Sequence, residues 1–543
     1  MSSRTSRPMT LTATVAAAGV VQLPTAAIVV AIPTIHAEFG TSTAELQWLV
    51  TAFMIPFSSF LIASGRLADI FGRRRNLLIG SALFGAGSIL AAAAPGVEVL
   101  IAGIALAGAG GALIMPASMS ILTNVFTGAR RGTAIGLWGA ATELVSGVGV
   151  LIGGVLTGAL DWRWIFVLTA LIAAGIALLA IRGAPESRDR NASRDVDLLG
   201  VALSASSLTA LTLALIQGAA WGWGSPAVVG LLVGAAALGV AFVVVERHAA
   251  NPIIDFSFFR RRNFAGSMAV IFVLDFSFGA LLFFLPLYLQ EILDYTPTEV
   301  GALLLPLTGL MVLGSPLGGR VASRTGPRIP IAIGLTLMAA AVFWISELTL
   351  STDYGQLVVP TAMMGFGVGF ALTPMNLAAM NAVSRDHAGA ASGLLVTLSG
   401  LGATLGVAVT GAMFNELNAE RTVSDVGAAG VEITRSQAQD LDGVLAGAPG
   451  SVETLKRIAG DDASEAREAI REAFVSSLGT SLKISAALIV LGLILSVVLM
   501  RRSSPVDARP IPPPIPTTAT PRPTPRGIER EEDSPTPSAG APT

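Results

Sequence analysis

The stretch GRLADIFGRRRNL, from Gly65 to Leu77, carries five charged residues among its thirteen. The segments on both sides of it are nearly all apolar. A charge inside the hydrocarbon core of a membrane costs several kcal/mol, so a compact charged turn between two apolar segments is typical of a loop that joins two membrane spans. The sequence therefore predicts that the chain crosses a membrane on each side of this turn.

The composition of the whole chain gives the same indication. The chain has 543 residues, of which 52% are hydrophobic and only 13% are charged, and its mean hydropathy is +0.70. A soluble protein carries about 25% charged residues. The apolar residues gather in blocks of about 20, the length that a helix needs to cross the bilayer. We therefore expect an all-α integral membrane protein, and the absence of cysteine excludes disulfides and thiolate metal sites.

The apolar blocks predict fourteen spans. The first of them has span length and no clear small-residue cleavage site, so it is expected to be retained rather than removed as a signal peptide. The predicted spans lie near residues 11–35, 46–64, 76–95, 98–122, 132–158, 162–181, 198–217, 225–245, 264–289, 298–318, 329–348, 356–378, 388–414 and 482–500.

Basic residues predict the orientation of these spans. The short N-terminus and the loops on its side of the membrane hold 20 of the 34 lysines and arginines, whereas the short opposite loops hold only Arg163. Cytoplasmic loops carry the excess of basic residues, so both termini are expected in the cytoplasm of a multi-pass protein of the plasma membrane.

Two segments lie outside the spans. The outer loop at 415–481 ends in ASEAREAIREAFVSSL, whose Ile470, Phe474 and Leu478 form one stripe, which predicts a surface-lying helix that leads into the last span. The tail at 501–543 contains twelve prolines and is expected to be disordered.

The opening turn has a second copy. Gly65–Arg74 aligns with Gly319–Arg328, five of the ten positions are identical, and each copy follows the second span of a six-span block. Two such halves around a central site describe a secondary transporter. The predicted parts are an N-terminus at 1–10, a first half at 11–181, an inserted helix pair with its linkers at 182–262, a second half at 263–500 and the tail.

These residues resemble the major facilitator superfamily, in its fourteen-span drug:proton antiporter branch. The turn matches the family's signature between spans 2 and 3. The stretches DWRWIF at 161–166, LPLYLQ at 285–290 and AGAASGLLVTLSGLGATLGVA at 388–408 resemble the same branch. The resemblance covers about residues 10–500. It implies two pseudo-symmetric six-helix halves, multidrug efflux, antibiotic resistance and exchange for protons.

The resemblance also implies a cytoplasmic gate. Glycines permit a tight turn and close helix approach, and Asp69 would be favourable beside a helix N-terminus or an arginine, supplied by Arg73, Arg130 or Arg131. The alternative is that the arginines only fix topology and that Asp69 offsets their charge. In the second copy Ser323 replaces the carboxylate. The predicted gate residues are Gly65, Asp69, Gly72, Arg73, Arg74 and Arg130.

Two acids are expected near the middle of the membrane. Glu143 lies about 18 Å beyond Arg131 along its span, and Asp275 about 20 Å beyond Arg262, at 1.5 Å per residue. A carboxyl shielded from water can load and release a proton, which predicts proton coupling at both positions. The alternative for each is a structural carboxyl paired with a neighbouring helix.

Other polar and small residues inside the spans have two interpretations each. Three polar residues, Gln22, Trp138 and Asn376, have two interpretations: they line a central cavity, or they are ordinary packing residues. The G-x-x-x-G pairs Gly149–Gly153 and Gly154–Gly158 predict close contact with a neighbouring helix. Their place in the chain resembles that of the family's antiporter motif.

The sequence departs from the family pattern at four positions. An aspartate and an asparagine usual in span 1 are Pro24 and Val29 here, the span-4 arginine is Ile104, and the proline of the antiporter motif is Val150. These departures weaken the expectation of cationic drugs and of the family's usual proton route.

The sequence as a whole favours a secondary active exporter of hydrophobic or amphipathic small molecules, with protons and the bilayer as its other partners. A lipid, glycolipid or metabolite exporter with weak or no proton coupling is the alternative. No nucleotide, nucleic acid or cofactor is expected. A nucleotide-binding Walker A motif needs Gly-Lys, and both lysines of the chain, Lys456 and Lys483, follow leucine. The three histidines are scattered, which argues against an enzyme, and the mid-membrane acids argue against a scaffold.

Overall fold

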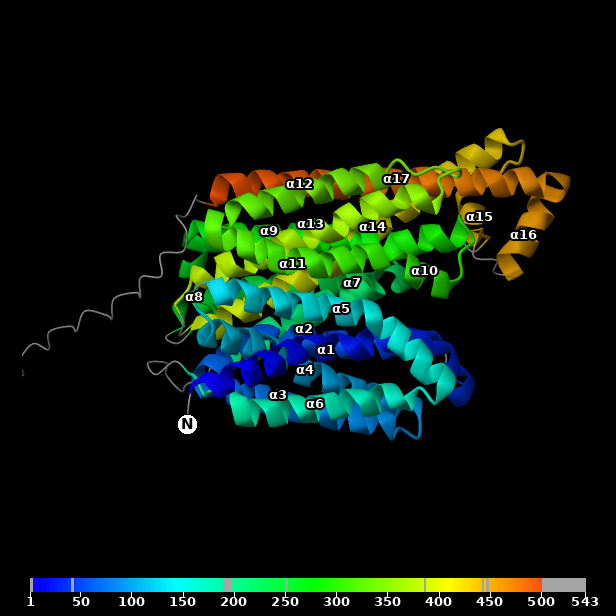
Figure 1. The fold of residues 1–543 in the computed structure, drawn as a ribbon. Helices are drawn as coiled ribbons and strands as arrows, with labels where there is room; N and C mark the ends of the chain where they lie inside the picture. Colours follow the sequence, from blue (N-terminus) through cyan, green and yellow to red (C-terminus); the bar gives the residue numbers. More distant parts are fainter. Residues whose placement is uncertain are drawn as a thin grey trace, which may run out of the picture. The chain divides into compact units, whose positions relative to one another are not determined.

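The long apolar segments fold as helices that lie alongside one another (Figure 1). The computed structural model describes residues 3–40, 43–127, 129–188, 197–249, 252–384, 387–441, 444–445 and 449–500, and these residues contain no strand. Fourteen of the helices are long and apolar enough to cross a membrane. The prediction of an all-α, fourteen-span chain is therefore confirmed.

The first six helices pack among themselves, largely through small residues. A Cβ at Gly87 would lie 2.5 Å from the backbone nitrogen of Ala107, so α3 and α4 touch backbone to backbone. The helix α5 lies against α1, and α6 lies against α1 and α3. Their bounds are α1 Ser3–Phe39, α2 Thr43–Phe71, α3 Arg73–Ala92, α4 Val97–Val125, α5 Ala129–Ala159 and α6 Arg163–Gly183.

A second group of helices follows further along the chain. The span expected at 298–318 is divided at Leu304 into a short helix and a longer one, α10 and α11, and the longer one runs on to Thr325. The bounds of the group are α9 Arg262–Glu291, α10 Pro297–Leu303, α11 Leu305–Thr325, α12 Arg328–Ile345, α13 Tyr354–Asn381, α14 Ala388–Ala428 and α17 Ala463–Leu499.

Between these groups, the chain forms a helix pair, α7 (Leu198–Trp221) and α8 (Pro226–His248), and a short 3-10 helix, η1 (Phe256–Arg260). The pair is attached through α7, which packs on α2 and α14. Hydroxyl pairs join α7 to α2, with Ser58 Oγ 3.0 Å from Thr212 Oγ1 and Ser59 Oγ 2.7 Å from Thr209 Oγ1.

Among the described residues, the segment at 415–481, expected to lie outside the membrane between the last two spans, is mostly helical. The helix α14 continues to Ala428, and α15 (Arg435–Asp440), α16 (Pro449–Ala459) and η3 (Gly460–Asp462) follow. Figure 1 shows α15 and α16 at the end of the bundle away from the N-terminus. We call this the far end and the opposite one the N-terminal end.

The helix expected at ASEAREAIREAFVSSL is present and leads into the last span, but its apolar stripe packs inside the protein instead of lying on a surface. The helix α17 runs without interruption from Ala463 through the last span. The stripe of Ile470, Phe474 and Leu478 is buried, and the ring of Phe474 contacts that of Phe414 on α14 at a centroid distance of 5.0 Å. The predicted disordered tail at 501–543 lies outside the described residues.

Two pairs of helices bring the first group against the second. At the N-terminal end, α2 packs on α14 and α5 packs on α11. A Cβ at Gly319 would lie 2.8 Å from the carbonyl oxygen of Gly132, and a Cβ at Gly65 would meet the carbonyl oxygen of Gly389. Both crossings therefore require glycine, and both repeat copies lie at such a crossing.

Candidate functional site

The charged turn lies where α2 ends at Phe71 and α3 begins at Arg73. Gly72 joins them with φ of 113°, a conformation that residues with a side chain rarely adopt. A Cβ there would also lie 2.7 Å from Glu186 Oε1. Gly72 therefore permits both the turn and the approach of the Glu186 carboxylate.

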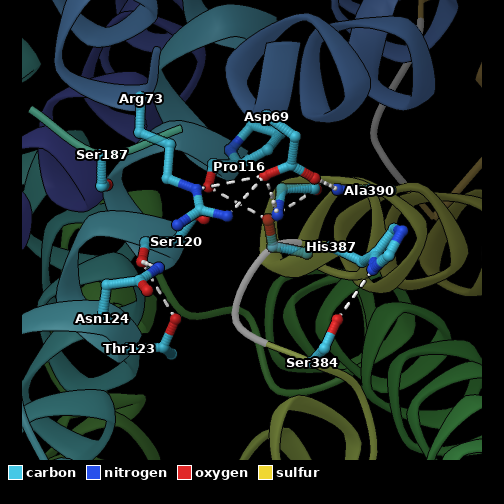
Figure 2. Close-up of polar contacts among 12 residues, drawn as sticks. Asp69, Arg73, Pro116, Ser120, Thr123, Asn124, Ser187, Ser384, His387 and Ala390 are labelled. Carbon is cyan, nitrogen blue, oxygen red and sulfur yellow. Dashed lines mark hydrogen bonds and ion pairs between the residues drawn. The ribbon is translucent and has the colours of Figure 1, made fainter. Parts of the chain in front are cut away.

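Asp69 is the centre of the site. Its Oδ1 accepts hydrogen bonds from Arg73 Nε at 3.1 Å and Nη2 at 2.7 Å, and both side chains are almost completely buried. The backbone N–H groups of Gly389 and Ala390 donate to the two carboxylate oxygens, each at 2.9 Å. Figure 2 shows the carboxylate between the guanidinium and the start of α14.

This arrangement places a negative charge at the positive end of the α14 dipole. Burying a carboxylate is costly unless it is paired and hydrogen-bonded, and here it is both. The hydroxyl of Ser392, near the start of α14, also donates to the carbonyl of Pro116 on α4 at 3.0 Å. We call the contact of Asp69 with Arg73, Gly389 and Ala390 the latch, since it joins helices from the two groups.

The other arginines of the turn attach it elsewhere. Glu186, which follows α6, accepts from the backbone N–H groups of Arg74 and Arg75 at 3.1 and 3.2 Å. The Arg74 guanidinium donates to the carbonyl of Ala184 at 3.4 Å. Arg74 therefore holds α3 to the end of α6 and does not enter the latch.

The arginines before α5 do not supply the partner of Asp69. Arg130 is exposed on a cavity of about 350 Å³ that Arg7 and Phe126 also line. Arg131 donates to Asn381 Oδ1 at 2.6 Å and to the carbonyl of Met380 at 3.1 Å. Among the three candidate partners, the structure selects Arg73, whereas Arg131 makes a separate tie between α5 and α13.

The second copy of the turn makes a neutral contact. Ser323 is half-buried, and its hydroxyl donates to the carbonyl of Arg320 within the same helix. On the inner side of α11, Ser315 donates to the carbonyl of Gly136 at 3.0 Å and lies 2.7 Å from the hydroxyl of Thr373. The crossing of α5 with α11 therefore has hydroxyl contacts where the crossing of α2 with α14 has a charged latch.

Of the two acids expected near the middle of the membrane, only Asp275 has a side chain within the described part of the structure. Asp275 lies on the side of α9 that packs against α14, where its carboxyl interacts with the Ser399 hydroxyl. Its Oδ2 is buried and has no hydrogen-bond partner among the residues that the structure describes. Glu143 lies in α5, but its side chain falls outside the described part of the chain.

The three candidate cavity residues lie on three helices. Trp138 is buried on α5, and its indole N–H donates to Ser118 Oγ at 3.0 Å, so this donor already has an acceptor within the protein. Asn376 is buried on α13, and Gln22 is half-buried on α1. The role of these three residues as a cavity lining therefore stays a prediction.

The two glycine pairs of α5 differ. Gly149 and Gly153 lie against α1, and a Cβ at Gly153 would be 2.5 Å from the carbonyl oxygen of Ala27. A Cβ at Gly154 would come no closer than 3.8 Å to Val30, and one at Gly158 would have no neighbour within 4 Å. Close helix contact therefore involves the first pair alone among these described glycines.

The four positions that depart from the family pattern differ in burial. Pro24 and Ile104 are buried among apolar residues, whereas Val29 and Val150 are exposed on the helix surfaces. The chain therefore packs apolar side chains at two of the sites where the family usually has charges.

A second buried charged cluster was not predicted. Glu246, on α8, is 2% exposed and accepts from the backbone N–H of Ile254 at 2.8 Å. It interacts electrostatically with Asp197, which caps α7, and with Arg66 of the charged turn. The cluster therefore places charges of the inserted pair beside the turn. Its position next to Arg247 and His248 at a span end makes Glu246 resemble an ordinary interfacial charge.

At the far end, the DWRWIF stretch has a structural explanation. Glu38 Oε1 lies 2.6 Å from Arg163 Nη2, and Glu38 Oε2 accepts from Trp162 Nε1 at 2.7 Å. The Arg163 guanidinium lies 4.4 Å from the Trp162 ring centroid. Hydrogen bonding to Arg163 holds the pKa of Glu38 below its usual value, with a smaller contribution from Trp162. Within the described ranges, no three His, Cys, Asp or Glu side chains gather to hold a metal ion.

Comparison with known proteins agrees with this architecture. Residues 14–407 match the family model of the Major Facilitator Superfamily. The puromycin resistance protein of Streptomyces alboniger is 35% identical over 385 residues, which cover 70% of this chain and 76% of that protein. The tetracenomycin C resistance and export protein of Streptomyces glaucescens is 27% identical over 526 residues, 94% of this chain and 95% of that one.

Solved structures share the fold. The human organic anion transporter superposes with a TM-score of 0.57 at 14% identity and covers 90% of this chain and 99% of its own. A proton:xylose symporter superposes with a TM-score of 0.59 at 13% identity, over 93% of this chain and 98% of its own.

Proposed function

Because the chain belongs to the Major Facilitator Superfamily, and so is a multi-pass membrane transporter and not an enzyme, we propose that it exports hydrophobic or amphipathic drug-like molecules by alternating access. The names of its relatives support this cargo, since two of them are resistance proteins for small antibiotics. The observation that carries the proposal is the latch, which joins helices of two different groups at one end of the bundle.

The latch supports alternating access because its contacts are discrete. Opening the N-terminal end between α2 and α14 requires the carboxylate of Asp69 to leave the N–H groups of Gly389 and Ala390 together. Charge-assisted hydrogen bonds of this kind are stronger than neutral ones. With the N-terminal end in the cytoplasm, as the arginine distribution predicts, the latched state would expose the cargo site to the outside.

We further propose that the export is coupled to the exchange of protons. Asp275 supports it, because a buried carboxyl oxygen without a partner is a position where a proton can be held and released. Asp275 lies on the contact of α9 with α14, the helix whose first turn is held by the latch. Protonation of Asp275 could therefore act on the helix that opens and closes. Glu143 in α5 is the second proposed carrier.

The test uses the protein in liposomes with an imposed pH gradient, a hydrophobic fluorescent cation and a neutral lipophilic dye. We expect uphill movement of at least one dye, abolished by a protonophore and lost in Asp275→Asn. The control Glu432→Gln removes an exposed acid far from the spans and should transport normally. Movement that ignores the gradient would contradict proton exchange, and no movement of either dye would contradict drug export.

One observation favours a second candidate function. Pro24 and Ile104 are buried apolar residues at positions where the family pattern has an acid and an arginine. A site without these charges suits a neutral or amphipathic cargo such as a lipid, glycolipid or metabolite. In the same liposomes, transfer of a fluorescent lipid between leaflets without dye export would favour this candidate.

A further inference from the structure

A polar cavity of about 440 Å³ lies at the far end of the bundle, away from the latch. Three elements form it: the residues 346–349 that follow α12, the part of α14 near Arg421, and the beginning of the last span in α17. A Cβ at Gly479 would meet the carbonyl oxygen of Ser346, so α17 and the end of α12 touch at its wall.

The charged side chains of this cavity are only partly paired. Lys483 Nζ and Glu347 Oε1 form an ion pair at 2.8 Å. Arg421 Nη2 donates to Thr480 Oγ1 at 2.9 Å, but its Nη1 is buried and finds no acceptor among the described residues. Asp425, one turn further along α14, lines the same cavity and forms no ion pair within the described chain.

An unfilled donor and an unpaired acid, one helical turn apart, favour a ligand that carries both charges. A guanidinium prefers phosphate or carboxylate oxygens, which it can bind through two N–H groups. A carboxylate binds a cationic group, and an ammonium is the cation that phospholipid headgroups carry. A simple anion would be repelled by Asp425, and a simple cation by Arg421.

The surroundings indicate that the ligand has apolar chains. The apolar part of α12 ends at Ile345, directly before the cavity, so the cavity lies at the level where hydrocarbon gives way to headgroups. Phe343 and Trp344 on α12 are 56% and 49% exposed, and Ile484 on α17 is 40% exposed. Tryptophan is enriched at this level of the bilayer, and the exposed apolar surface continues from the edge of the cavity.

We propose that this cavity binds the headgroup of a zwitterionic phospholipid, phosphatidylethanolamine in chemical class. The phosphate is held by Arg421, with the Thr480 hydroxyl beside it, and the ammonium is held by Asp425. The acyl chains lie along α12 and α17. This site is separate from the latch and does not depend on the cargo.

Native mass spectrometry of the full chain in detergent tests the proposal. Phosphatidylethanolamine, phosphatidylglycerol and soluble glycerophosphoethanolamine are added separately, and bound adducts are counted. We expect phosphatidylethanolamine to be retained best, and Arg421→Gln to weaken its retention about tenfold, the value of one hydrogen bond to a charged group. The control Arg457→Gln removes an arginine of the same end that lies outside the cavity and should change nothing.

A second variant separates the two charges and guards against misfolding. Asp425→Asn is nearly isosteric, and it should abolish the preference for phosphatidylethanolamine over phosphatidylglycerol while thermal unfolding stays normal. Equal retention by wild type and both variants would overturn the proposal. Binding of glycerophosphoethanolamine as tight as that of the intact lipid would also overturn it, because the ligand would then be a soluble zwitterion.

Discussion

At Asp69, one side chain completes the hydrogen bonding of groups that are far apart in the sequence. The carboxylate accepts from Arg73 in its own loop and from the backbone of Gly389 and Ala390, about 320 positions along the chain. Breaking a buried pair by removing one partner costs about 3–5 kcal/mol, because the remaining charge is left without compensation. The latch is therefore the residue-scale feature on which substitutions should act most strongly.

We expect Asp69→Asn to weaken the latch and to reduce transport in the liposome assay by at least about tenfold, since a loss of 1.4 kcal/mol already corresponds to a factor of ten. The buried Arg73 guanidinium would lose its counter-charge, so unfolding in detergent should also occur at a lower temperature. The matched control is Ser323→Ala in the second copy, where the hydroxyl makes only a local bond. Equal loss in the two variants would contradict the assignment of the latch to Asp69.

The pair of Glu38 with Arg163 predicts a pH dependence at the far end. The folded pKa of Glu38 is lowered, chiefly by hydrogen bonding to Arg163, below its usual value near 4.5. The ionised carboxylate therefore stabilises the folded state fully above the unfolded pKa, and this stability is lost as pH falls through the folded pKa.

Thermal unfolding from neutral pH down to about pH 3 checks this. Wild type should unfold at a higher temperature than Glu38→Gln at neutral pH, and the difference should shrink below a pH of about 4.5. The pair is partly exposed, so the difference should be small. A difference that stays constant with pH would exclude ionisation of Glu38 as its cause.

Sequence reasoning reaches some of these residues and not others. Asp69 and Arg73 are four positions apart at a helix boundary, so their pairing can be predicted locally. The other half of the latch consists of backbone N–H groups, which carry no residue signature. Glu246 and its neighbours Asp197 and Arg66 are brought together only by the packing of α7 on α2 and of α8 on α7, so their cluster cannot be predicted from spacing.

At the scale of the elements, helix contacts depend on which face of a helix a glycine occupies. The motif G-x-x-x-G occurs three times in α5, at Gly132–Gly136, Gly149–Gly153 and Gly154–Gly158, but only Gly149 and Gly153 approach α1 closely. The sequence identifies the motif, yet it cannot tell which pair meets a neighbour, because rotation of a helix about its axis is set by packing. The structure resolves this ambiguity.

We expect Gly153→Val to separate α1 from α5, since its Cβ would lie 2.5 Å from the Ala27 carbonyl oxygen and 2.7 Å from the Ala27 Cα. Overpacking of this kind costs about 1–3 kcal/mol, so folded yield and thermal stability should fall. Gly158→Val, in the same helix with open space around it, is the control and should behave as wild type. Fluorescence-detected gel filtration of both variants after heating measures the difference, and equal stability would contradict the contact.

Element boundaries were predicted well within the membrane and poorly beyond it. Hydropathy marks where a helix leaves the hydrocarbon, but it does not mark where the helix ends. The polar stretch NELNAERTVSDVGA, at 415–428, is predicted as loop by hydropathy, although it contains no proline and continues α14. Buried residues such as Val426 and Ile433 belong to the same apolar core as the second group of helices, so packing stabilises these helices beyond the predicted spans.

For the molecule as a whole, the two repeat copies make similar backbone crossings with different chemistry. Gly65 meets Gly389 as Gly319 meets Gly132, yet only the first crossing has a carboxylate four residues further on. The repeat was visible in the sequence, and so was the replacement by Ser323. Which helix ends face each other across the two copies could not be predicted, because that depends on how the two groups of helices are placed together.

This asymmetry predicts the effect of restoring the acid. Ser323→Asp places a carboxylate near the first turn of α5, where Gly132 meets α11. A negative charge at a helix N-terminus is favourable by about 0.3–1 kcal/mol, so we expect higher thermal stability and slower transport. The control is Ser323→Asn, which adds similar bulk without charge. Faster transport, or equal effects of Asp and Asn, would contradict a second latch.

The length of α14 has a mechanical consequence. The helix contains 41 residues from Ala388 to Ala428 with no proline to bend it, so it is a rod of roughly 60 Å at 1.5 Å per residue. Asp69 grips this rod at its first turn, and Arg421 lies near its other tip. A tilt of a few degrees at the grip would sweep that tip through several ångströms. Because the contact with Asp69 lies at one end of α14, a small tilt of the helix there becomes a much larger displacement at its opposite end.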